Sequence, residues 1–122
     1  MNEHKLTQLA EFVLPEGITD YFLVVSIENQ DDKLTIALEE KNDVPSKYKD
    51  KKLESKGFYP PTMIQDFPIR EWKVFLKIRC RKWKDRESGK VVRRDWQLAA
   101  KGTSITKEFA SFLKEMVGYP AG

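Results

Sequence analysis

Two kinds of side chain alternate in the segment 73–83. Every second position from 74 to 80 is apolar: Val74, Leu76, Ile78 and Cys80. The positions between them are basic or aromatic: Lys73, Phe75, Lys77, Arg79, Arg81 and Trp83. Because successive side chains of a β-strand point to opposite faces, this pattern predicts a strand with one buried face and one cationic face. The chain is therefore expected to build a sheet with a hydrophobic core on one side.

Positive charge is concentrated in the same part of the chain. Residues 70–101 carry twelve basic and four acidic side chains, a net charge of +8, whereas the whole chain carries +3. Residues 1–69 hold thirteen acidic and eight basic side chains. Such asymmetry favours a surface that binds an anionic partner, with nucleic acid as the first candidate. The alternative is a solvated sheet face, with Phe75 and Trp83 covered by the acidic N-terminal half or by another subunit.

Hydrophobic periodicity predicts the other elements. The expected order is a helix at about 4–14, strands at 21–28 and 33–40, a further run of strands that includes 73–83 and 91–98, and a helix at about 104–117. Residues 41–61 have no such period and are expected to form a long loop. The predicted fold class is one α+β domain over residues 1–122, with an antiparallel sheet of about four to five strands packed against an N-terminal and a C-terminal helix.

Composition argues against several classes of function. No apolar run approaches the roughly 20 residues of a transmembrane helix, and the N-terminus does not resemble a signal peptide, so a cytoplasmic protein without membrane contact is expected. Cys80 is the only cysteine and His4 the only histidine. A cysteine-rich zinc site and a histidine-activated cysteine nucleophile are therefore not expected within this chain. We expect no enzyme activity and no cofactor.

Five blocks of sequence carry a resemblance to a known family. The blocks are LESKGF (53–58), IQDFPIR (64–70), VFLKIRCRKW (74–83), RDW (94–96) and KGTSITKEFASFL (101–113). In this order and spacing they resemble the N-terminal region protein of bacterial insertion-sequence transposases of the ISAon family. The likeness covers most of the chain after about Leu34. It implies a non-catalytic accessory module for transposition, which helps to bind mobile-element ends during DNA recombination.

The resemblance also implies a partner and a missing metal. The partner would be a separately encoded or frameshift-joined catalytic transposase subunit. The same core looks like the N-terminal zinc ribbon of a larger group of transposases, in which cysteine pairs near the hairpin turn bind zinc. Here residues 84–89 read KDRESG, without cysteine. No metal is therefore expected, and the turn should be held by ordinary hairpin chemistry.

The leading hypothesis is a DNA-binding module that contacts phosphates with a basic β-hairpin. Its predicted nucleic-acid-binding residues are Lys77, Arg79, Arg81, Lys82, Trp83, Lys84, Arg86, Arg93 and Arg94. The alternative is a protein interaction module, in which the hairpin docks on an acidic surface of the catalytic subunit without direct DNA contact. Docking on a second copy, which would give a homodimer, belongs to the same alternative. Binding to duplex DNA with and without the catalytic subunit distinguishes the two hypotheses.

Overall fold

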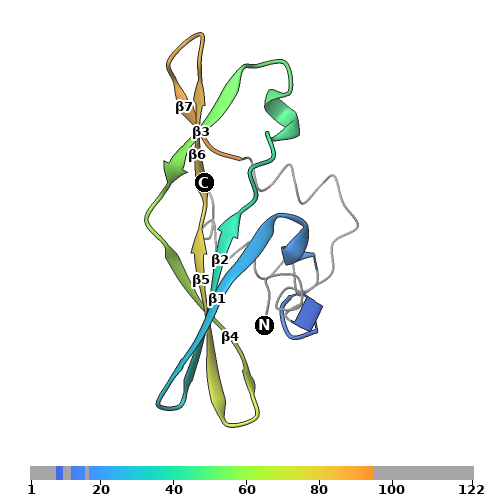
Figure 1. Cartoon of the computed structure of the whole chain (residues 1–122), viewed down its shortest axis with the longest axis vertical. Coiled ribbons are helices and arrows are strands. Elements are labelled where there is room, and N and C mark those ends of the chain that lie inside the picture. The colour runs from blue at the N-terminus through green and yellow to red at the C-terminus, as the bar shows by residue number, and fades with distance from the viewer. Residues whose placement is uncertain (1–7, 10–11, 16, 95–122) are drawn as a thin grey trace, which may run out of the picture.

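The computed structural model of the chain describes residues 8–9, 12–15 and 17–94 (Figure 1). Strands make up 55% of these residues and form two sheets, of four and three strands. The strands are β1 (Phe22–Gln30), β2 (Lys33–Glu40), β3 (Leu53–Phe58), β4 (Thr62–Ile69), β5 (Trp72–Arg79), β6 (Arg81–Asp85) and β7 (Val91–Val92). Two short 3-10 helices accompany them, η1 (Ile18–Asp20) and η2 (Ser46–Tyr48).

The four-stranded sheet has the order β1-β2-β5-β4. Its outer pairs, β1 with β2 and β4 with β5, are antiparallel hairpins, whereas the central pair of β2 and β5 is parallel. The turn of the first hairpin is formed by Asp31 and Asp32, as their turn-forming chemistry predicts. Asp31 has φ 58, a left-handed conformation that aspartate tolerates better than most residues.

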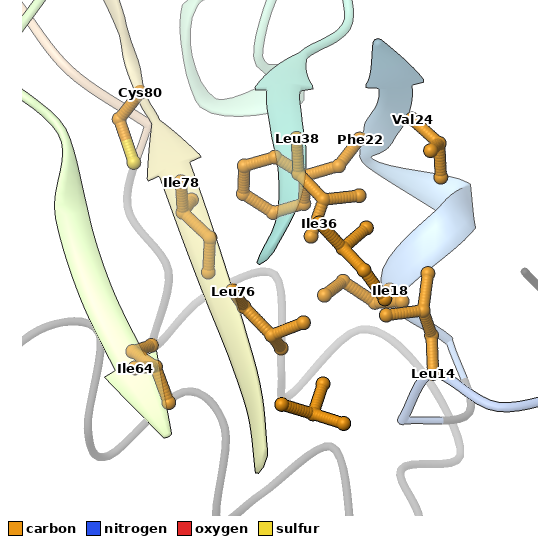
Figure 2. Packing of buried hydrophobic residues seen from close by; sticks show 11 residues of the cluster. Leu14, Ile18, Phe22, Val24, Ile36, Leu38, Ile64, Leu76, Ile78 and Cys80 are labelled. Carbon is orange, nitrogen blue, oxygen red and sulfur yellow. The ribbon is translucent and has the colours of Figure 1, made fainter. Parts of the chain in front are cut away.

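The hydrophobic core lies on one face of this sheet. The apolar positions of β5, Val74, Leu76 and Ile78, are at most 2% exposed, and Cys80 is 5% exposed, which confirms the predicted alternation. Side chains of β1, β2, β4 and the segment around η1 complete the cluster: Leu14, Ile18, Phe22, Val24, Ile36, Leu38 and Ile64. Figure 2 shows Leu14 and Ile18 facing the apolar side chains of the sheet.

The second sheet continues from the first along the chain. Strand β4 runs antiparallel to β5, with Thr62 opposite Ile78. Strand β3 precedes β4 and runs antiparallel to β6, which follows β5, with Ser55 opposite Trp83. Between these pairs, Tyr59 N donates a hydrogen bond of 2.8 Å to Cys80 O. The short strand β7 adds to the other side of β6 and gives the order β3-β6-β7. In Figure 1 this three-stranded sheet lies at one end of the molecule, with the tips of the β1–β2 and β4–β5 hairpins at the other.

The expected α+β fold class is wrong, because the described residues are mostly β and contain no α-helix packed on a sheet. Of the helix expected over residues 4–14, the described part has helical backbone only at Gln8 and Leu9 and a turn at Phe12 and Val13. Leu9 and Val13, whose apolar spacing predicts this helix, are 53% and 46% exposed. So short a helix needs tertiary packing of its apolar face, and these side chains do not receive it.

Two further expectations for the sheets are corrected. Residues 41–61 were expected to form a long loop, but they contain β3. The Lys and Gly residues of β3 have low strand propensity, and its pairing with β6 makes this segment a strand. The sheet is also not purely antiparallel, because β2 and β5 are parallel. The returning strand expected at 91–98 is represented by β7, and residues 95–98 lie outside the described residues. The helix expected at about 104–117 also lies outside them.

Candidate nucleic-acid interface

The alternation of buried and outward side chains shifts by one residue where β5 passes into β6. In β5 the even-numbered positions are buried, whereas in β6 the buried side chains are those of Trp83 and Asp85. Cys80 lies between the two strands and belongs to neither. Because side chains alternate with a period of two, a one-residue shift moves every later side chain to the other face. Arg81 and Trp83 therefore point inward, and Lys82 and Lys84 lie on the opposite face.

A buried carboxylate lies on the inward side of Arg81 and Trp83. Glu40, the last residue of β2, is 1% exposed. Its Oε1 accepts a hydrogen bond of 3.0 Å from Arg81 N, and its Oε2 accepts one of 3.3 Å from Trp83 Nε1. Arg94 Nε lies 3.0 Å from the same Oε2 and forms a salt bridge with it. Burial of a charge requires such compensation, so these contacts stabilise the junction of the two sheets.

Three of the predicted nucleic-acid-binding residues therefore have structural partners. Arg81 also donates from Nε to Glu40 O at 2.8 Å and from Nη1 to Ser55 Oγ at 2.6 Å. Arg94 donates from Nη2 to Asp43 O at 2.6 Å. Trp83 is 1% exposed, which contradicts its predicted place on a cationic surface. The physical reason is the one-residue shift after Cys80, whose trace in the sequence is Lys82 at the position where the next apolar residue would fall.

Lys77 and Arg79 lie on a different surface, the outer face of the four-stranded sheet. Arg79 Nη1 is 3.2 Å from Glu39 Oε2, in an ion pair between neighbouring strands β5 and β2. Phe75, on the same face, is half-buried, and Lys33 Nζ lies 5.9 Å from its ring centre. The segments of this sheet, residues 22–40 and 62–79, hold seven acidic and five basic side chains. The four-stranded sheet thus has little of the positive charge expected for it.

The positive charge belongs to the three-stranded sheet and its connections. We call β3, β6 and β7, with the adjoining residues 46–52, 86–90 and 93–94, the basic sheet. Residues 46–58 and 81–94 contain twelve basic and four acidic side chains, a net charge of +8. Five of these cations are lysines of the segment that was expected to be a loop: Lys47, Lys49, Lys51, Lys52 and Lys56. These lysines were not among the predicted site residues, because only the pairing of β3 with β6 brings them beside the β6–β7 hairpin.

The tip of the β6–β7 hairpin is organised by Asp85. Its backbone N–H donates to Lys90 O at 2.8 Å, and its carbonyl accepts from Gly89 N at 2.7 Å. Its Oδ1 accepts a hydrogen bond of 2.9 Å from Glu87 N, which is the main reason that the pKa of this carboxyl lies below its usual value. Gly89 has φ 77, a conformation that favours glycine. The tip therefore presents Arg86, which is exposed, on an ordered turn.

The outer face of the basic sheet carries the remaining predicted residues. Lys82 and Lys84 are half-buried in β6, and Arg93, which follows β7, is exposed. Lys82 Nζ and Arg93 Cζ lie 5.3 and 4.9 Å from the ring centre of Tyr59. The structure thus brings Lys82, Lys84, Arg86 and Arg93 together on one sheet and its tip. Tyr59 was not among the predicted residues, and no local sequence signal marks it.

Cys80 sits beside this face but is an unreactive thiol. It is 5% exposed, and burial, helped by the negative charge of Glu40, raises its pKa from 9.0 to about 11. The thiolate is the nucleophilic form of cysteine, so a raised pKa suppresses its chemistry. Cys80 therefore acts as a small hydrophobic residue at the junction of the two sheets.

The raised pKa of Cys80 predicts a measurable loss of stability in alkali. The unfolded chain releases the thiol proton near pH 9.0, whereas the folded chain holds it until about pH 11. The contribution of Cys80 to the free energy of unfolding is therefore complete below pH 9.0 and falls as pH rises towards about 11. Urea unfolding across this range should show a steeper decline for the wild type than for Cys80→Ala. Parallel pH profiles for the two proteins would contradict the burial of the thiol.

Comparison with known proteins adds no assignment: no family model, no curated protein and no solved structure matches this chain. Within residues 8–9, 12–15 and 17–94, no group of three or more His, Cys, Asp or Glu side chains is placed to hold a metal ion. The same part of the chain has no helix that is both long and apolar enough to cross a membrane. The function must be inferred from geometry and charge.

Proposed function

We propose that this chain is a non-catalytic module that binds duplex DNA through the outer face and the tip of the basic sheet. The observation that supports this most is the pairing of β3 with β6, which gathers twelve basic and four acidic side chains on one end of the molecule. Like charges at this density repel one another, and an anionic partner relieves the repulsion. The phosphates of a DNA duplex supply such a partner.

The basic side chains differ in their freedom to bind phosphate. Arg79 and Arg94 already form salt bridges with Glu39 and Glu40. Among the described residues, Lys84 and Arg86 have no ion pair and lie on either side of Asp85 in the chain, on the outer face and at the tip. Contacts of this kind position a protein on the duplex but do not specify its sequence. Sequence readout by this module alone is therefore modest.

Five sequence blocks resemble ISAon-family transposases. This resemblance favours the ends of a mobile element as the duplex that the module binds. A separately encoded or frameshift-joined catalytic subunit would then carry out the strand transfer. Such a module would work in the cytoplasm, where bacterial DNA lies. If the chain binds DNA only when the catalytic subunit is present, docking on an acidic protein surface is the better explanation of the positive charge.

The variant Lys84→Ala/Arg86→Ala should weaken the dependence of DNA binding on salt. Each phosphate contact releases counterions, so the slope of log affinity against log salt changes by about 0.9 per contact. Loss of both side chains should therefore reduce the slope by about 1.8. Fluorescence anisotropy with a labelled duplex of mixed sequence, measured over a series of salt concentrations, gives this slope.

The matched control is Lys77→Ala/Arg79→Ala on the outer face of the four-stranded sheet. It removes the same charge but leaves the basic sheet intact, so the slope should stay at the wild-type value. If this control reduces the slope as much as Lys84→Ala/Arg86→Ala, the DNA lies on the four-stranded sheet instead. A wild-type chain with no salt-dependent affinity for duplex DNA would overturn the proposed function.

A further inference from the structure

Tyr59 holds two cationic side chains over one aromatic ring. Lys82 Nζ lies 5.3 Å and Arg93 Cζ 4.9 Å from the ring centre. We infer that Lys82 and Arg93, positioned by Tyr59, form a preorganised clamp for the sugar–phosphate backbone of one DNA strand. This inference rests on the proposed function and adds to it a defined phosphate site and a positioning residue.

The ring of Tyr59 is fixed before any ligand binds. Tyr59 lies between β3 and β4, and its N–H donates a hydrogen bond of 2.8 Å to Cys80 O. Its half-buried side chain packs against the hydrophobic core of the four-stranded sheet. A cation over such a ring is attracted by the negative face of the π system. The two cations therefore sit on a rigid support at the junction of the two sheets.

The two cations lie close together beside the pair of β6 and β7. Trp83 is the partner of Val92, and Lys84 is the partner of Val91, in this antiparallel pair. Lys82 precedes Trp83 and Arg93 follows Val92, and both cations lie over the ring of Tyr59. Like charges that lie close together repel one another. Among the described residues neither cation forms an ion pair with a carboxylate, so the ring of Tyr59 and a bound anion would both reduce their repulsion.

The guanidinium of Arg93 is oriented by the ring of Tyr59, whose centre lies 4.9 Å from Cζ. A guanidinium presents five donors in a planar fork, so restraint at the ring leaves further donors for phosphate oxygens. Because its orientation is set in the free protein, less conformational entropy is lost on binding. The site therefore suits a phosphate rather than a diffuse counterion atmosphere.

The arrangement favours the backbone of DNA over an unpaired base. An aromatic side chain that stacks on a base needs an open face. Tyr59 packs against the core and carries two cations, so its partners are already in place. The neighbouring ring of Phe58 provides an internal comparison, because Arg81 Cζ lies 4.7 Å from its centre. Arg81 is bound to Glu40 and Ser55 on the inward side, and it cannot serve as a DNA contact.

The test combines substitutions of the ring and of the cations in the full chain. Lys82→Ala/Arg93→Ala should reduce the salt slope for a mixed-sequence duplex by about 1.8. Tyr59→Leu should weaken binding by about fivefold in the wild-type background, whereas Tyr59→Phe should bind like the wild type because it keeps the ring. In the Lys82→Ala/Arg93→Ala background, Tyr59→Leu should have no further effect. The matched control Phe58→Leu should change affinity little in either background.

The outcomes separate the clamp from the proposed function. Equal weakening by Tyr59→Leu in both backgrounds would mean that the ring acts on DNA directly or through folding, and would overturn the clamp. An unchanged salt slope for Lys82→Ala/Arg93→Ala would also overturn the clamp. The salt slope of Lys84→Ala/Arg86→Ala tests the proposed function separately. Thermal melts of each variant show that binding is measured on folded protein.

Discussion

Replacing Glu40 by alanine is expected to lower the free energy of unfolding by about 3–5 kcal/mol. The substitution leaves the Arg94 guanidinium, whose side chain is 11% exposed, without its carboxylate. It also removes the acceptor of the buried Trp83 Nε1–H and of Arg81 N. An uncompensated buried charge and unpaired donors cost far more than a lost surface contact. Urea unfolding followed by tryptophan fluorescence measures the loss.

The neighbouring acid Glu39 offers a matched control for Glu40. Its carboxylate pairs with Arg79, but the two side chains are 29% and 38% exposed. Exposed ion pairs contribute roughly 0–1 kcal/mol, so Glu39→Ala should change the free energy of unfolding by no more than this amount. The variant Glu40→Gln, which keeps one acceptor oxygen, should fall between the two. Equal losses for Glu39→Ala and Glu40→Ala would show that the buried network does not hold the two sheets together.

Replacing Trp83 by alanine should act on stability and not on DNA binding. Trp83 is 1% exposed and is the largest of the fully buried side chains in the described residues. Truncation of a buried tryptophan costs about 3–5 kcal/mol, because contacts are lost and a cavity remains. This is a large share of the roughly 5–15 kcal/mol that stabilises a typical domain. At a temperature where the variant is folded, its affinity for duplex DNA should match that of the wild type.

Two further substitutions identify the source of the effect at Trp83. Trp83→Phe keeps much of the buried ring volume but loses the hydrogen bond from Nε1 to Glu40, which should cost about 1 kcal/mol. Trp72→Ala removes a tryptophan that is 36% exposed at the β4–β5 turn and should cost less than Trp83→Ala. A Trp83→Ala protein that melts like the wild type and loses DNA affinity would contradict the burial of Trp83 and support its predicted place among the nucleic-acid-binding residues.

Local pattern was enough to predict several features of this protein. The alternation of Val74, Leu76, Ile78 and Cys80 identifies the central strand and its buried face. Successive side chains of a strand point to opposite faces, so burial of one face appears in the sequence as a period of two. The two strands expected at 21–28 and 33–40, which pair as the hairpin of β1 and β2, follow from the same kind of evidence. The excess of positive charge is a property of composition and needs no structure to be seen.

The placement of that charge depended on tertiary structure. Strand β3 has a weak local pattern and becomes a strand by pairing with β6, about 30 residues later, which gathers the lysines of both segments. The side chains of Arg81, Trp83 and Arg94 are held inward because the carbonyl and carboxylate oxygens of Glu40 accept their hydrogen bonds across 41, 43 and 54 residues of sequence. Such contacts leave no periodic trace in either segment. A single residue, Cys80, shifts the alternation between two sheets, and only the packed structure decides which face each later cation occupies.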